Sequence, residues 1–270
     1  DGVSFWTKLP YNAGNSLSSN HSMKLEASAL NRYAITIHDT LETGEIDSYS
    51  LPKPIGGNDK FFSVNYKYVN RKPRKSNQYL PAHGFGIELK LIKGQRYKNS
   101  SYDKYSFDSF LNLSLKKLVL YSRFKIQGVR GAIFPQDGIW FSQDQPIYIS
   151  GTRGPEMFEE NLRPRGWLGE PIIGNNMIFI TNELRAPIPI KLPVEFFGIK
   201  AGNLSAALFQ DYGSVSNANI HIVGYEAKIS ILSLKAPILF LSYGEAQTLD
   251  DWIEYKKPSK YIQMSLINPF

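Results

Sequence analysis

The chain has 270 residues, of which 42% are hydrophobic, so it is long enough for one large domain and too apolar for a disordered polypeptide. It contains no cysteine, which excludes disulfide bonds and thiolate metal sites. The formal net charge is +7, but the basic residues are scattered, and the short basic run at residues 70–75 is interpreted as a solvated turn rather than a nucleic-acid-binding patch.

Apolar and polar residues alternate along most of the chain. In residues 60–70, for example, Phe62, Val64 and Tyr66 alternate with polar side chains, which is the period of a strand with two different faces. Many of these runs extend to ~9–11 residues, the length of a tilted membrane strand. We therefore predict an all-β chain of about twelve strands, near residues 2–10, 23–30, 32–40, 60–70, 84–93, 105–115, 118–134, 175–186, 197–211, 222–232, 236–244 and 260–270.

The connectors between these strands differ in length. Tight joins fall at residues 115–118 and 232–237, whereas long polar segments fall at residues 42–59, 93–104, 135–175 and 244–259. Short turns at one end and long loops at the other are typical of outer-membrane β-barrels. The expected fold is a single domain, residues 1–270, forming a transmembrane antiparallel up-and-down β-barrel. Alternation alone also permits a soluble β-sandwich, in which the apolar face would meet a second sheet.

The last ten residues combine alternation with a terminal aromatic residue. Ile262, Met264 and Leu266 alternate with polar residues, and the sequence ends on Phe270. This segment resembles the C-terminal targeting strand of outer-membrane β-barrels. We expect Ile262, Met264 and Leu266 to face lipid, and Phe270 to matter for membrane insertion more than for stability.

Three motifs in the second half of the chain carry a resemblance to a known family. Arg165-Gly166-Trp167 lies within a long polar segment, Glu183-Leu184-Arg185-Ala186-Pro187 ends the following strand, and Phe209-Gln210-Asp211-Tyr212-Gly213 lies in the next strand. Together and in this order they resemble motifs of the bacterial surface antigen family, which holds the C-terminal barrels of outer-membrane assembly factors and their translocation relatives. The resemblance is clear from about residue 135 onward and looser before it.

The resemblance implies a long loop that folds into the barrel. Loop 135–174 would place the Arg165-Gly166-Trp167 tip in the lumen, where Asp211 and Glu183 could both offer carboxylates to the Arg165 guanidinium. An arginine–carboxylate pair of this kind is directional and fixes geometry. The barrel of that family has sixteen strands, so the alternative is that this chain is the C-terminal part of such a barrel.

The sequence contains no recognisable enzyme signature. It lacks a Gly-x-Ser-x-Gly elbow, a His-Glu-x-x-His pair and a phosphate-binding loop, so we expect no catalytic activity, cofactor or metal ion. The resemblance implies a Gram-negative outer-membrane protein that helps insert or translocate other proteins. Its partners would be outer-membrane lipids, lipopolysaccharide and other outer-membrane or periplasmic subunits, and not nucleic acid.

Two alternative functions remain open at this level. The first is a plugged barrel that serves as a membrane anchor or partner-binding platform without insertase activity. The second is a soluble sandwich that binds carbohydrate. Full pairing between the first and last strands would favour the anchor, and a short or kinked seam would favour a gate.

Overall fold

The fold was examined in a computed structural model. The residues that it describes are 2–11, 19–32, 39–40, 46–47, 56–72, 83–96, 100–131, 139–141, 165, 172–191, 195–196, 199–216, 218–233, 236–249 and 259–266. These residues form one 12-stranded sheet and two separate two-stranded ribbons. No helix among the described residues is long and apolar enough to cross a membrane.

The large sheet follows the chain in an up-and-down order, and all of its strand pairs are antiparallel. Its main path is β1 (Gly2–Tyr11), β2 (Ser19–Arg32), β5 (Gly57–Lys72), β6 (His83–Arg96), β7 (Ser101–Leu115), β8 (Leu118–Gly131), β11 (Asn176–Lys191), β13 (Ile199–Val215), β14 (Ala218–Ser233), β15 (Ala236–Thr248) and β16 (Ser259–Leu266). The short β12 (Glu195–Phe196) pairs with β13 beside this path. The predicted all-β, up-and-down architecture is confirmed.

One predicted strand lies largely outside the described residues, and one predicted connection differs from the structure. Of the strand predicted at residues 32–40, Arg32 is the last residue of β2, and residues 33–38 lie outside the described residues. The short β3 (Asp39–Thr40) pairs with β4 (Ile46–Asp47) in a separate ribbon. The connector predicted at residues 93–104 is much shorter, because β6 continues to Arg96 and β7 begins at Ser101.

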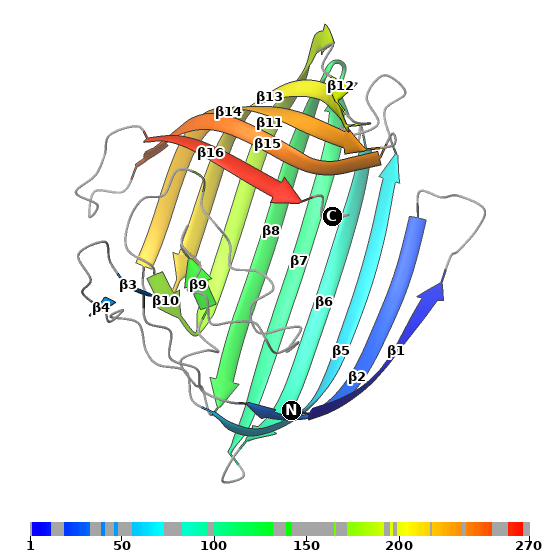
Figure 1. Ribbon diagram of the computed structural model, residues 1–270, viewed down its shortest axis with the longest axis vertical. Helices are drawn as coiled ribbons and strands as arrows, with labels where there is room; N and C mark the ends of the chain where they lie inside the picture. The colour runs from blue at the N-terminus through cyan, green and yellow to red at the C-terminus, as the bar shows by residue number, and fades with distance from the viewer. Residues whose placement is uncertain are drawn as a thin grey trace.

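The sheet curls so that it has a concave and a convex face (Figure 1). Because neighbouring strands alternate in direction, the two longest connectors on the main path, after β2 and after β8, lie at one end of the sheet. We call this the loop end. At the opposite end, which we call the turn end, β7 and β8 are joined through a two-residue turn in which Lys116 adopts a φ of 58°. Positive φ is what the primed hairpin turns require.

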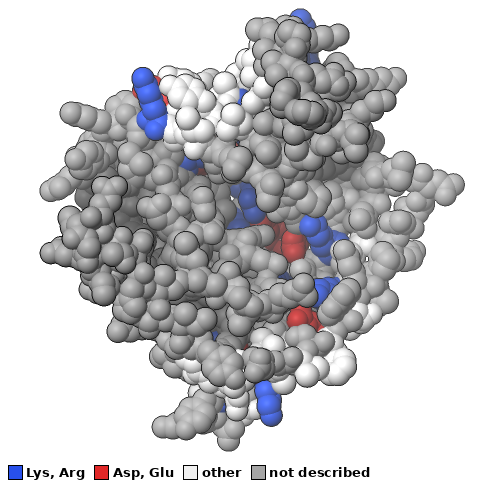
Figure 2. Space-filling model, viewed as in Figure 1, with Lys and Arg blue, Asp and Glu red and all other residues white. Residues whose placement is uncertain are grey.

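The two faces of the sheet have opposite chemistry. Figure 2 shows acidic and basic side chains together in the hollow of the concave side. Buried polar residues of the sheet are Glu26, Ser28, Asp59, Ser63, Arg96, Asp108, Asn112, Lys125, Thr181, Glu183, Asp211, Glu226, Ser242 and Thr248. Exposed large hydrophobic residues include Phe5, Phe62, Phe85, Leu89, Leu91, Leu111, Leu113, Leu115, Ile178, Leu208, Leu241 and Ile262.

This arrangement is the reverse of a sheet in a water-soluble sandwich, which buries its apolar face. On β6, exposed Leu89 and Leu91 alternate with half-buried Glu88 and Lys90. A continuous exposed apolar surface of this kind marks a site of contact with a membrane or with another protein. The observed faces therefore count against the sandwich alternative.

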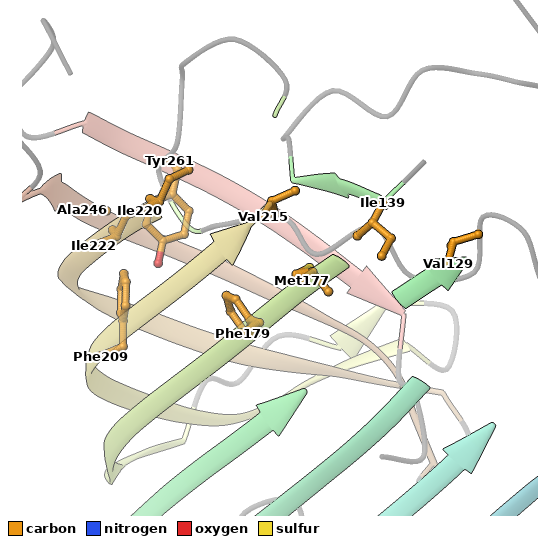
Figure 3. Close-up of a cluster of buried hydrophobic side chains, with 10 residues drawn as sticks. All are labelled: Val129, Ile139, Met177, Phe179, Phe209, Val215, Ile220, Ile222, Ala246 and Tyr261. Atoms are coloured by element: carbon orange, nitrogen blue, oxygen red, sulfur yellow. The ribbon is translucent and has the colours of Figure 1, made fainter. Parts of the chain in front are cut away.

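A cluster of buried apolar side chains lies on the concave face near the loop end (Figure 3). Its members are Val129, Ile139, Met177, Phe179, Phe209, Val215, Ile220, Ile222, Ala246 and Tyr261. Ile139 belongs to the ribbon of β9 (Ile139–Phe141) and β10 (Ile172–Gly174), which frames the segment that carries Arg165. The cluster thus holds the base of that segment against the inner wall.

The sheet is not closed within the described residues, because no pairing joins β1 to β16. These two strands are the first and last of an alternating path with an odd number of strands, so they run in the same direction. An antiparallel closure would therefore need a strand between them. The prediction of a complete barrel of about twelve strands is confirmed only as a curved, up-and-down sheet.

Candidate functional site

The candidate site is a patch of polar side chains on the concave faces of β11, β13 and β14. In the register of these strands Thr181 lies opposite Asp211, Glu183 opposite Phe209, and Ala207 opposite Glu226. Because side chains alternate between faces with a period of two, all of the acidic residues of this patch point to the concave side. Asp211 and Glu226 are each only 2% exposed, and Glu183 is 6% exposed.

Arg165 reaches this patch from the long connector between β8 and β11. Its Nε donates to Asp211 Oδ2 at 2.8 Å, its Nη1 donates to Glu183 Oε1 at 3.0 Å, and its Nη2 donates to Thr181 Oγ1 at 2.7 Å. A second hydrogen bond from Nη2 to Asp211 Oδ1 makes the contact with Asp211 bidentate. The guanidinium therefore occupies a site built by two adjacent strands, and a 3.5 Å contact from Nη1 to Glu226 Oε1 adds a third.

An aromatic ring completes the binding site for the guanidinium. The Arg165 Cζ atom lies 3.6 Å from the centroid of the Phe209 ring, which is a cation–π geometry. Thr181 also donates to Asp211 Oδ1, so the carboxylate that receives Arg165 is itself held in place. Planar stacking on one side and bidentate bonding at the edge suit arginine and no other cationic side chain.

The charges of the site are balanced. Glu183 also pairs with Arg185, and Glu226 also pairs with Lys228 at 3.0 Å. Three carboxylates therefore face three cationic side chains. Burial alone would lower the pKa of the Arg165 guanidinium, but the carboxylates of Glu183 and Asp211 raise this pKa above its ordinary value. Arg165 therefore remains charged at neutral pH.

A hydrogen bond connects this site to the last strand of the sheet. Glu226, Gly244 and Tyr261 lie side by side in the register of β14, β15 and β16, and the Tyr261 hydroxyl donates to Glu226 Oε2 at 3.2 Å across the intervening strand. The contact is possible because position 244 is glycine: a Cβ there would lie 2.7 Å from Tyr261 Cζ. The loop arginine and the edge strand β16 thus share one carboxylate, Glu226.

The structure brings together Arg165, Asp211 and Glu183 of the predicted site. Gly166, Trp167 and Phe270 lie outside the described residues, as do the side chains of Met264 and Leu266. Ile262 is 75% exposed while its neighbour Tyr261 is buried, so β16 has the predicted outward and inward alternation at these two positions. The roles of these residues in loop docking and in targeting remain predictions.

Sequence reasoning missed Thr181, Glu226 and Tyr261 as members of the site. Glu226 did carry a signal, since it is the one acidic residue of β14 and is followed two positions later by Lys228. Tyr261 carried a weaker one, as a large side chain at an inward position. Metal binding is not indicated: among the described residues no cluster of His, Asp and Glu could hold a metal ion.

The concave face carries further ion pairs away from this site. Arg123 and Lys125 of β8 both contact Asp108 of β7. At the loop end, Asp59 receives a hydrogen bond from the Tyr102 hydroxyl at 2.9 Å, and the Arg96 guanidinium stacks 4.0 Å from the Tyr102 ring centroid. These contacts keep the inner wall polar well beyond the Arg165 site.

No protein-family model matches the chain, and no curated protein sequence matches it. A structural comparison matches CdiB from Acinetobacter baumannii with 12% sequence identity and a TM-score of 0.38, covering 98% of this chain and 50% of that one. The chain therefore spans half the length of that structure. Similarity at this level does not assign the chain to a family.

Proposed function

We propose that this chain forms the wall of a β-barrel in a Gram-negative outer membrane and helps to insert or translocate other proteins. In this it would be similar to the bacterial surface antigen family. The observation that carries the proposal is the contact of Arg165 with Asp211 and Glu183. It joins in space the three sequence motifs on which the resemblance rests.

The distribution of side chains supports the membrane location. The convex face carries exposed leucine, isoleucine and phenylalanine side chains, and the concave face carries paired charges. A membrane barrel has this pattern, with lipid outside and a wet interior. The soluble carbohydrate-binding alternative would require the opposite arrangement.

The two sheet edges support a gate rather than a static anchor. Backbone groups at an open edge are costly in lipid, so β1 and β16 need a partner when they lie in a membrane. Since β1 and β16 run in the same direction, one added strand could pair antiparallel with both. The Glu226 carboxylate, which contacts both Arg165 and Tyr261, links the docked loop to β16.

The proposal is tested by measuring insertion of a second barrel. The chain is reconstituted into liposomes, and an unfolded eight-stranded outer-membrane barrel is diluted out of urea into them. We expect its folding, followed by heat-resistant gel mobility, to be several-fold faster than in protein-free liposomes. The control variant Asp103→Ala changes an exposed carboxylate of β7, a strand that contributes no residue to the Arg165 site.

Two other outcomes would contradict the proposal, one its insertase activity and the other its membrane location. If this chain inserts but the probe barrel folds no faster, the insertase activity is wrong and the plugged anchor or partner-binding platform takes its place. If the chain remains in the aqueous phase without detergent or lipid, the membrane location itself is wrong.

A further inference from the structure

A groove crosses the convex face at the loop end of β1, β2, β5, β6 and β7. It has a volume of about 540 Å³. Two adjacent rows of residues in lateral register form it: Phe5, Ala27, Phe62 and Lys93 in one row, and Val3, Ala29, Lys60, Gln95 and Ser101 in the other. The groove exists because the small side chains of Ala27 and Ala29 lie between larger ones on both sides.

The walls of the groove are apolar and open to the outside. Phe5 is 74% exposed, Val3 is 57% exposed and Phe62 is 50% exposed. These side chains face the phase that surrounds the sheet, which is lipid if the proposed function is correct. The groove is within the ~300–1,000 Å³ range of ligand-binding clefts. It would accept an acyl chain better than any polar molecule.

Two lysines, Lys60 and Lys93, line this groove together with its apolar residues. Lys60 and Lys93 are both exposed, and neither forms an ion pair within the described part of the chain. Each lies three residues inside its strand from the loop end, at the level where β5 and β6 change from apolar to polar outward residues. The nearest acidic residue in register is Asp103, opposite Lys93. Lysines near a lipid surface attract anionic headgroups.

The outward residues of the same strands are different at the turn end. There Tyr68 contacts Phe85 with ring centroids 5.2 Å apart and His21 with ring centroids 4.3 Å apart. Tyrosine and phenylalanine at a barrel rim form the aromatic girdle of a membrane interface. The convex face is therefore asymmetric in this region, with a cationic rim at the loop end and an aromatic rim at the turn end.

We propose that this groove binds a phosphorylated glycolipid of the outer leaflet, namely the lipid A part of lipopolysaccharide. The inference rests on the proposed membrane location, because long barrel loops lie outside the cell and so place the loop end in the outer leaflet. Lys60 and Lys93 bind the lipid A phosphates. Phe5, Ala27 and Phe62 contact an acyl chain that lies in the groove.

The test compares lipid binding by variants of the whole 270-residue chain. Each variant is first inserted into vesicles and checked for heat-resistant gel mobility, then transferred to detergent and titrated with lipid A under native mass spectrometry. Failure of insertion would overturn the proposed function, whereas failure of binding by an inserted barrel overturns only this inference. Lys60→Gln with Lys93→Gln should weaken lipid A binding about 25-fold, because each lysine contributes about a factor of five.

The controls separate a specific lipid-binding site from nonspecific electrostatic attraction between lysines and anionic lipid. Lys116→Gln with Lys117→Gln removes two exposed lysines at the turn end and should leave binding unchanged. Ala29→Leu fills the groove, keeps both lysines and should also weaken binding. Equal binding of phosphatidylglycerol, full competition by inorganic phosphate, or wild-type binding by the Lys60/Lys93 double variant would each overturn the proposal.

Discussion

Asp211→Ala should release the Arg165 loop and destabilise the folded chain by on the order of 3 kcal/mol, the range observed when one partner of a buried ion pair is removed. The substitution leaves the Arg165 guanidinium without its bidentate acceptor, and it also leaves Thr181 without the carboxylate to which it donates. Unfolding by urea in lipid vesicles measures the free energy. Protease cleavage within residues 142–164 measures release of the loop.

The double variant shows whether Arg165 and Asp211 stabilise the fold through their mutual contact or independently of each other. Arg165→Ala should also release the loop, and Arg165→Ala with Asp211→Ala should cost less than the sum of the single variants, because contacting residues couple by about 0.5–3 kcal/mol. Asp103→Ala, a change at an exposed carboxylate, is the matched control and should have little effect. Strictly additive losses would contradict the docking interaction.

Leu89→Arg should reduce the free energy of folding into a bilayer by about 2–4 kcal/mol, the cost of arginine near the midplane on the lipid side of a barrel. Leu89 lies near the centre of β6 and is 42% exposed on the convex face. The measurement is urea-dependent folding into liposomes. The same experiment in a detergent micelle should show a smaller loss, since a micelle deforms around a charge more easily.

Gln127→Arg is the control for that substitution. Gln127 lies on β8 at an inward position between buried Lys125 and buried Val129, so its side chain faces the concave side of the sheet. We expect only a small loss at this position. Equal losses for Leu89→Arg and Gln127→Arg would mean that the faces of the sheet are not divided between lipid and water.

Much of the sheet follows from local sequence pattern. Strands such as β5 and β8 are visible as alternation, and the faces follow because a period of two assigns every side chain once one is known. The connector predicted at residues 93–104 shows the limit of this reasoning. Its polar residues resemble a loop, but β6 continues to Arg96 and β7 begins at Ser101. Strand pairing between β6 and β7 therefore extends past the point where the apolar alternation ends.

Some residues of the candidate site could be predicted from the sequence, and others could not. Arg165, Glu183 and Asp211 could be placed together because they belong to motifs with a family resemblance. Glu226 and Tyr261 could not, since their contact depends on the register of three strands and on the absence of a side chain at Gly244. A shift of one residue in either pairing would turn one of the two side chains to the other face.

The division of the sheet into a lipid face and a polar inner face is tested most directly by fluorescence quenching. The chain has no cysteine, so Leu111→Cys and Gln127→Cys each give one unique labelling site on the convex and concave faces. After insertion into vesicles, a bimane label at position 111 should be quenched by brominated acyl chains, and a label at position 127 should not be. Equal quenching at both positions, or stronger quenching at position 127, would contradict a membrane barrel with a polar interior.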